Sequence, residues 1–170
     1  MEIEKKYLLK EQPDLSQFKC CEIEQGYLTR RPTLRIRKRD DDYIFTYKSK
    51  IKGTPKNIAV NDEVERPLTK EAYDKLREKT DGYLIQKTRY LIPIRAEYTR
   101  KEEVFPEELT VELDVFHGRL EGLVFAEIEF PSEEAAECFL APQWLGKDVS
   151  DDHRYSNGYL SEVEKYEMYE

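Results

Sequence analysis

Alternating polar and apolar residues recur along most of the 170-residue chain, and this period of two predicts β-strands. Successive side chains of a strand point to opposite faces, so residues 1–9 would place Glu2, Glu4 and Lys6 on one face and the apolar Ile3 and Tyr7 on the other. Further strands are predicted over residues 21–28, 33–39, 43–50, 59–65, 83–96, 109–116 and 123–130. This pattern predicts a mainly antiparallel β domain.

Residues that favour turns and helix ends separate the strands. Thr69 is predicted to cap a helix that ends near residues 80–82, and Ser132 is predicted to cap a second helix over residues 133–140. A short helix is expected over residues 159–168, and a loop over residues 52–57. The aromatic face of the strand over residues 43–50 would pack on these helices or on a second subunit, so a monomer and a homodimer both stay open.

The composition supports one folded domain over residues 1–170. Charged residues make up 38% of the chain and hydrophobic residues 39%. Such a high charge could indicate disorder, but the 12 Tyr, the 7 Phe and the regularly spaced aliphatic residues argue against it. A chain of this length can bury a substantial core without disulfides.

The net charge and the cysteines limit the partners and the compartment. A net charge of −8 offers no basic field for general nucleic-acid binding. Cys20, Cys21 and Cys138 show no metal-ligand spacing and fit a reducing compartment. No run of residues has the length and apolarity of a membrane span or a secretory h-region. The expectation is a cytoplasmic protein with no nucleic-acid or membrane partner.

The charged faces of the predicted strands are sorted by sign. A solvent-exposed sheet face would explain any single alternating strand, but such faces usually mix charges with Thr, Ser and Gln. Acidic pairs are Glu2/Glu4, Glu63/Glu65, Glu112/Asp114 and Glu127/Glu129. Basic pairs are Arg35/Arg37, Lys48/Lys50 and Lys87/Arg89. The sorting recurs in strand after strand, which favours a functional face over a solvated one.

A barrel that closes with these faces inward would need its charges to be segregated. Two like charges about 4 Å apart repel by roughly 4 kcal/mol at an effective dielectric near 20, so each pair needs counter-charges or bound ions. Gathered carboxylates would bind divalent cations, and gathered Arg and Lys side chains would bind an anion with several charges. The ligand that requires both is a metal-bound polyphosphate.

The order of these motifs resembles that of the CYTH superfamily, the triphosphate tunnel metalloenzymes. The opening Glu2-Ile3-Glu4-Lys5-Lys6 is similar to the ExExK signature of that family, and the resemblance covers nearly the whole chain. The run from Asp114 to Phe130 resembles that of the short bacterial members. Asn61 departs from the pattern, because an arginine is expected two residues before the acidic pair that begins at Glu63.

The resemblance implies an eight-stranded antiparallel closed barrel, or tunnel, with a charged lumen, a few flanking helices and Mg²⁺ or Mn²⁺ as cofactor. It implies metal binding by Glu2, Glu4, Glu127 and Glu129. It implies catalytic roles, through a second metal or an oriented water, for Glu63, Glu65, Glu112 and Asp114, with Lys6 beside them. It implies triphosphate binding by Lys6, Arg35, Arg37, Lys48, Lys50, Lys87 and Arg89, and Arg154 in a segment that closes the tunnel mouth.

The expected activity is a metal-dependent triphosphatase that hydrolyses the terminal phosphoanhydride of inorganic tripolyphosphate, with some activity on nucleoside triphosphates. The sequence assigns no aromatic pocket to a base, which favours a ligand that is all phosphate. Class IV adenylate cyclase, thiamine triphosphatase and a non-catalytic polyphosphate-binding module are the alternatives. Phosphate release and cyclic AMP formation from ATP distinguish them.

Overall fold

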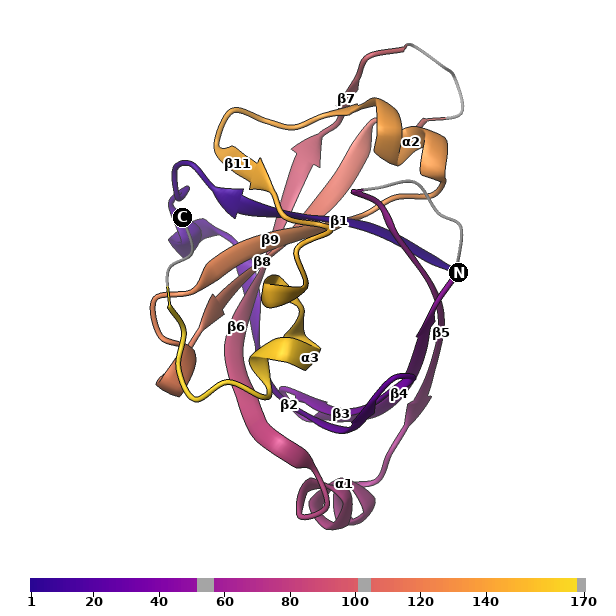
Figure 1. Cartoon of the computed structure of the whole chain (residues 1–170). Coiled ribbons are helices and arrows are strands. Elements are labelled where there is room, and N and C mark those ends of the chain that lie inside the picture. The colour runs from indigo at the N-terminus through magenta and orange to yellow at the C-terminus, as the bar shows by residue number, and fades with distance from the viewer. Residues whose placement is uncertain (52–56, 101–104, 168–170) are drawn as a thin grey trace.

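Eight antiparallel strands close into a barrel, which confirms the fold predicted from the sequence. The computed structural model describes residues 1–51, 57–100 and 105–167. The sheet closes because β1 pairs with both β5 and β9, and Figure 1 shows the resulting ring. Around the barrel, the strands are β1 (Glu2–Leu9), β5 (Ala59–Pro67), β4 (Asp42–Lys50), β3 (Thr33–Arg39), β2 (Lys19–Arg30), β6 (Asp81–Arg95), β8 (Glu108–Phe116) and β9 (Val124–Glu129).

Strand β1 forms the closing seam of the barrel. On one edge it pairs with β9, which places Glu4 opposite Glu129 and Lys6 opposite Glu127. Its other edge pairs first with β5 and then with the short strand β11 (Leu145–Asp148). Because side chains directly opposite each other in a sheet share a face, the seam brings the acidic residues of the two chain regions together.

The largest hydrophobic core lies outside the barrel wall. Aliphatic and aromatic side chains of β1, β8 and β9 pack there under α2 (Glu133–Cys138), β7 (Glu97–Tyr98) and β10 (Phe139–Leu140). Phe139 is at the centre of an aromatic group, with ring centroids 5.1 Å from Phe130 and 6.5 Å from Tyr7. Burial of these apolar faces outside the barrel leaves the opposite faces of the same strands for polar groups.

Helix α1 (Lys70–Arg77) covers the outer face of β3 and β4. Thr69 caps it by accepting a hydrogen bond from the Ala72 backbone N–H, as the sequence predicts. Tyr73 of α1 packs on Tyr43 of β4 with ring centroids 5.1 Å apart. Part of the aromatic face of β4 therefore packs on a helix of the same chain.

The C-terminal segment enters the barrel from one side. It contains the short 3-10 helix η3 (His153–Tyr155) and helix α3 (Asn157–Leu160), and Figure 1 shows α3 within the outline of the ring. Leu160 and Tyr155 pack there in a second core with Phe116 and Phe125. Two further 3-10 helices, η1 (Leu15–Gln17) and η2 (Gly118–Leu120), lie in connections between strands.

Two predicted helices have different bounds in the structure. Ser132 caps α2 as predicted, but the helix ends at Cys138 because Phe139 and Leu140 pair with β7 instead. The helix predicted over residues 159–168 is wrong: α3 ends at Leu160, and Arg119 Nη1 donates hydrogen bonds to the carbonyls of Leu160 and Val163. These bonds satisfy carbonyl groups that a longer helix would use.

Parts of two predictions lie outside the described residues, namely residues 52–56 of the predicted loop and Met168 of the predicted helix. Across the described ranges, no helix combines the length and the apolarity that a membrane span requires.

Candidate active site

The barrel lumen contains a cavity of about 490 Å³ lined by side chains from all eight barrel strands and from the C-terminal segment. The alternation that the sequence shows therefore places the charged faces inside. The lining includes thirteen of the residues singled out in the sequence: Glu2, Glu4, Lys6, Arg35, Arg37, Lys48, Lys50, Glu63, Glu65, Arg89, Glu112, Glu127 and Glu129.

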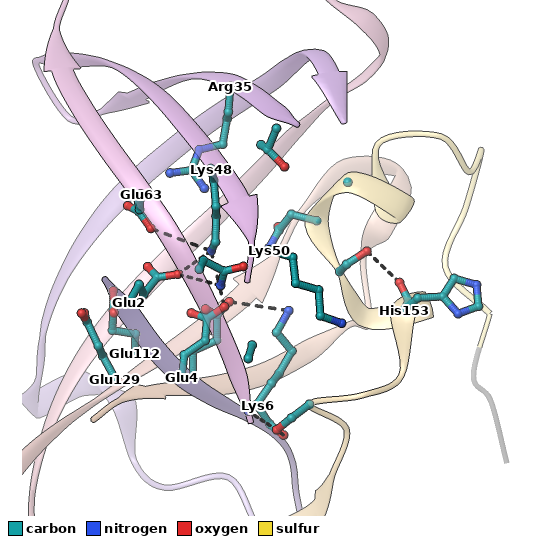
Figure 2. Close-up of a pocket in the computed structure, with 18 of the residues that line it drawn as sticks. Glu2, Glu4, Lys6, Arg35, Lys48, Lys50, Glu63, Glu112, Glu129 and His153 are labelled. Atoms are coloured by element: carbon teal, nitrogen blue, oxygen red, sulfur yellow. Dashed lines mark hydrogen bonds and ion pairs between the residues drawn. The ribbon is translucent and has the colours of Figure 1, made fainter. Parts of the chain in front are cut away.

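One side of the lumen is acidic. Five carboxylates from β1, β8 and β9 form this acidic wall, which consists of Glu2, Glu4, Glu112, Glu127 and Glu129. Figure 2 shows the carboxylates of Glu2, Glu4, Glu112 and Glu129 gathered on the same side of the cavity. Burial raises the pKa of Glu4 to about 7, and burial together with the charges of Glu2 and Glu112 raises the pKa of Glu129. The wall therefore favours a bound cation, which would lower the repulsion between its members.

Lys48 supplies positive charge to the acidic wall from β4. Its Nζ lies 2.6 Å from Glu2 Oε1, 3.4 Å from Glu4 Oε1 and 3.9 Å from Glu63 Oε2. The nearby Glu2 and Glu4 carboxylates raise the pKa of Lys48 against the opposing effect of its burial. Asn61 donates a further hydrogen bond to Glu2 at 3.3 Å, so this departure from the family pattern contacts an acid. In this structure Lys48 acts as the counter-ion of Glu2 and Glu4.

The carboxyl groups of the acidic pair of β5 shift each other's pKa in opposite directions. Burial raises the pKa of Glu63 to about 9, and hydrogen bonds to Glu2 and Glu65 add to the shift. The hydrogen bond from Glu63 lowers the pKa of Glu65, and it also lowers the pKa of Glu2 although burial opposes this. The raised pKa of Glu63 favours its protonated form, and the lowered pKa values of Glu2 and Glu65 favour their ionised forms.

The opposite side of the lumen is basic. Strand β3 lies three strands from β1 and four strands from β9 around the ring. It points three guanidinium groups into the lumen, and these form an arginine row that consists of Arg35, Arg37 and Arg39. Burial and repulsion from Arg35 and Arg89 lower the pKa of Arg37 to about 9, so the group remains charged at neutral pH. Within the described ranges, Arg35 Nε is buried without a hydrogen-bond partner. Arg35 and Arg37 are buried and Arg39 is exposed. A row of cations with spare donors is suited to a multiply charged anion.

Lys6 connects the acidic wall to the C-terminal segment. Its Nζ donates a hydrogen bond to the Tyr155 carbonyl at 2.7 Å and lies 3.8 Å from Glu127 Oε1. The same nitrogen lies 4.4 Å from the centre of the Phe125 ring. Lys6 therefore faces the cavity at the end that η3 and α3 close.

Lys87 and Asp114, two further predicted site residues, do not line the cavity. Both side chains are completely buried, and Lys87 Nζ lies 2.8 Å from Asp114 Oδ2. Asp114 also binds Arg89 through two hydrogen bonds of 2.8 and 2.9 Å, while Lys87 reaches Asn157 of α3 at 3.3 Å. The pair therefore connects β6 and β8 in the barrel wall with helix α3.

The predicted Arg154 is also absent from the cavity lining. Its Nη2 pairs with Asp152 at 2.6 Å, and Asp152 lines the cavity. The segment itself lies where the resemblance implies, since Ser150, Asp151 and Ser156 are part of the lining. The structure thus places the segment at the cavity and the Arg154 side chain against Asp152.

Several lining residues were not found from the sequence. Tyr27 of β2 reaches the lumen, and Arg39 extends the alternation of Arg35 and Arg37 that the sequence already shows. His153 lines the cavity, but its ring packs edge-on against Tyr159 at 5.3 Å, and Figure 2 shows the ring turned away from the carboxylates. Residues 149–158 carry no alternating pattern, so the sequence pattern does not show which of their side chains line the cavity.

The donor set of the acidic wall fits a hard divalent cation. Mg²⁺ and Mn²⁺ prefer carboxylate oxygens, and burial raises the pKa values of Glu4 and Glu129, which a bound cation would oppose. In the described part of the chain, no three or more Asp, Glu, His or Cys side chains are placed so that they could hold one metal ion together. At Glu2 and Glu4 the place of a metal ion is taken by the ammonium group of Lys48, which contacts both carboxylates.

A closed antiparallel barrel with an acidic wall opposite an arginine row defines a triphosphate tunnel protein of the CYTH type. The chain is 35% identical over 164 residues to an inorganic triphosphatase of Nitrosomonas europaea, covering 94% of this chain and 96% of that protein. It is 34% identical over 162 residues to an inorganic triphosphatase of Acetivibrio thermocellus, covering 94% and 92%.

A solved structure agrees with these relatives. The crystal structure of the inorganic triphosphatase NE1496 superposes with a TM-score of 0.64 at 32% identity, covering 98% of this chain and 97% of that chain. A scan against protein-family models finds no match. On the identity and coverage of its relatives, the chain belongs to the inorganic triphosphatase family.

Proposed function

We propose that the protein is a phosphohydrolase that cleaves the terminal phosphoanhydride of inorganic tripolyphosphate with the help of a divalent metal ion. The observation that carries the proposal is the segregation of charge in one cavity, where the arginine row faces the acidic wall. Both relatives from Nitrosomonas europaea and Acetivibrio thermocellus are inorganic triphosphatases, which supports the same substrate. Among the residues that line the described cavity, aromatic rings come only from Tyr27 and His153, which favours an all-phosphate ligand over a nucleotide.

Substrate binding falls to the basic residues of the lumen. Arg35 and Arg37 present guanidinium donors that match phosphate oxygens, and Lys50 adds a positive charge from β4. Lys6 would bind the phosphate group nearest to the C-terminal segment. These cations would also stabilise the charge that spreads over the transferring phosphoryl group, which accounts for most of the catalysis of such reactions.

The water that attacks the phosphorus must be oriented and must lose a proton. Glu65 is ionised because it accepts a hydrogen bond from Glu63 and faces the cations of the arginine row. It lies in the cavity lining on β5, between the acidic wall and β3. We assign Glu65 the role of orienting the water and accepting its proton, with Glu63 holding it in the ionised form.

The cofactor would be Mg²⁺ or Mn²⁺ held by Glu2, Glu4, Glu127 and Glu129. When bound, the metal would neutralise phosphate charge and act as a Lewis acid. Glu112 completes the acidic wall, although its carboxylate accepts a 2.7 Å hydrogen bond from Arg89. Glu2 is paired in a similar way with Lys48 at 2.6 Å, so a bound metal would displace cations from the wall.

The setting of the reaction is part of the proposal. The substrate is a small-molecule triphosphate, and the protein acts in the cytoplasm as a monomer or homodimer. The free thiols of Cys20, Cys21 and Cys138 fit a reducing compartment.

The proposal is tested by incubating the protein with ATP, and separately with tripolyphosphate, in the presence of Mg²⁺ or Mn²⁺. Phosphate release from tripolyphosphate is the expected result. Formation of cyclic AMP from ATP without phosphate release would identify a cyclase instead. Binding of tripolyphosphate without turnover under either metal would identify a binding module.

A further inference from the structure

Gln25 of β2 links two residues of the cavity by hydrogen bonds. It lies directly opposite Arg37 in the pairing of β2 with β3. Its Oε1 accepts a hydrogen bond from Arg37 Nε at 3.1 Å, and its Nε2 donates one to Tyr27 Oη at 3.1 Å. The Gln25 side chain is completely buried. Because an amide carries a donor and an acceptor, it can satisfy both neighbours at once.

Thr46 of β4 has the same relation to Arg35. The two residues are directly opposite in the pairing of β3 with β4, and Arg35 Nη2 donates a hydrogen bond to Thr46 Oγ1 at 3.1 Å. Thr46 is also completely buried. Two neighbouring arginines of one strand are therefore each held by an uncharged side chain from the adjacent strand.

Other cations near the cavity are held differently. Arg89 pairs with Asp114 and Glu112, and Lys48 pairs with carboxylates of the acidic wall. Within the described ranges, Arg35 and Arg37 form no ion pair. A guanidinium bound to a carboxylate has its charge neutralised, whereas one bound to an amide or a hydroxyl keeps it.

We propose that Gln25 and Thr46 are positioning residues, which fix Arg37 and Arg35 by neutral hydrogen bonds so that both cations face the lumen with their full charge. This inference rests on the proposed function, since the anion that it serves is tripolyphosphate. Binding the Nε of Arg37 leaves its two terminal amino groups for the anion, in the geometry that matches two phosphate oxygens.

Burying Arg35 and Arg37 with neutral partners lowers the folding stability of the protein without ligand. This supports a role of the two residues in ligand binding. Buried cations that form no direct ion pair destabilise a fold, and burial with repulsion from Arg35 and Arg89 lowers the pKa of Arg37 accordingly. A Glu at position 25 could form an ion pair with Arg37 and remove part of the cost. The chain instead has an amide there, which keeps the site electropositive.

The first test replaces Gln25 by Glu, which preserves the size of the side chain and its hydrogen bond to Arg37 but adds a charge. Gln17→Glu, at an exposed position of η1, adds the same charge away from the cavity as a matched control. We expect Gln25→Glu to raise the KM for tripolyphosphate about tenfold or more with a small change in kcat, and Gln17→Glu to behave as the wild type. A merely structural role predicts a lower Tm with an unchanged KM, and that result would overturn the proposal.

A second pair of variants tests Thr46 and covers the case in which Gln25→Glu does not fold. Thr46→Val keeps the shape of the side chain without the hydroxyl, and Thr46→Ser keeps the hydroxyl. We expect Thr46→Val to raise KM about three- to tenfold and Thr46→Ser to stay close to the wild type. Equal KM values for the two variants would contradict the role of Thr46.

A measurement without substrate separates this inference from the proposed function. In the NMR spectrum of the free protein, the Arg37 Nε–H should exchange slowly with solvent, and Gln25→Met should remove that protection. An Arg37 signal that is unchanged in Gln25→Met would overturn the positioning role. If the wild type neither binds nor hydrolyses tripolyphosphate, the proposed function fails whatever the arginine signal shows.

Discussion

The Lys48 ammonium lies 2.6 Å from the Glu2 carboxylate and 3.4 Å from that of Glu4, so a lysine holds the two acids with which the chain begins. A divalent cation bound to the same oxygens would repel this ammonium group. Metal binding and the contact of Lys48 with the acids therefore compete. Released from the acids, Lys48 would be available to the phosphate groups of a substrate.

This competition predicts an unusual effect of removing Lys48. We expect Lys48→Met to bind Mn²⁺ about tenfold more tightly than the wild type in the absence of triphosphate, and to bind tripolyphosphate more weakly. Isothermal titration with each ligand alone measures both effects. Lys50→Met, a lumen lysine of the same strand, is the control and should weaken tripolyphosphate binding only. Weaker Mn²⁺ binding by Lys48→Met would contradict the competition.

Glu4 is predicted to be necessary for turnover and unnecessary for folding. Glu4→Gln should lower phosphate release by about a hundredfold or more, because the acidic wall loses one of the oxygens that hold the metal. Its melting temperature should stay close to that of the wild type, since the amide replaces a carboxylate whose burial is unfavourable. The exposed Glu121→Gln serves as a control. Unchanged activity of Glu4→Gln would exclude the metal role of Glu4.

The buried pair of Lys87 and Asp114 is predicted to act on stability. Asp114→Asn leaves Lys87 and Arg89 without their shared carboxylate and should cost about 3–5 kcal/mol in the free energy of unfolding. Lys87→Met should cost less, because Arg89 still neutralises Asp114. Urea denaturation of both variants gives this order. A stable but inactive Asp114→Asn variant would instead return Asp114 to the catalytic group.

The contacts of Glu24 on the outer face of the barrel predict how the stability of the protein depends on pH. Glu24 accepts hydrogen bonds from Arg77 Nε at 2.7 Å and from Tyr73 Oη at 2.9 Å, and the bond from Arg77 is the largest cause of the lowered pKa of Glu24. The pKa of such a carboxyl group is lower in the folded protein than in the unfolded chain, where it is near 4.5. Its contribution to stability is complete above the pKa of the unfolded chain and is lost as the pH falls through the pKa of the folded protein.

Glu24→Gln should therefore be less stable than the wild type by about 1 kcal/mol at pH 7, and the difference should shrink as the pH falls below 4.5. Thermal unfolding over this range measures it. Glu78→Gln, on the same side of the molecule at the end of α1, should show no such dependence on pH. A constant difference between Glu24→Gln and the wild type at all pH values would show that the charge of Glu24 is not the cause.

The barrel and most of its charged lining could be predicted from the sequence. The alternation of Arg35 and Arg37, or of Glu127 and Glu129, directly gives the face on which each side chain lies, because a strand has a period of two. The order of the pairs along the chain supplied the family resemblance and with it the closure of the sheet. The relatives of the chain agree with that assignment.

Which of the inward-facing side chains reach the cavity could not be predicted in the same way. Lys87 and Arg89 share a face, yet only Arg89 reaches the cavity, and Lys87 contacts Asn157 of α3. The alternating pattern of a strand gives the face on which a side chain lies. It contains no information on a segment such as α3, which lies seventy residues further along the chain and packs against Lys87. Gln25 and Thr46 were missed for a related reason, since their role depends on residues directly opposite in neighbouring strands.

The central claim is tested most directly by measuring kcat/KM for tripolyphosphate, ATP and thiamine triphosphate side by side, with Mg²⁺, with Mn²⁺ and with a chelator. The charge segregation of the cavity predicts metal-dependent phosphate release from all-phosphate tripolyphosphate, with a kcat/KM well above those of the other two substrates. Equal or higher values for ATP or thiamine triphosphate, or full activity with the chelator, would contradict it.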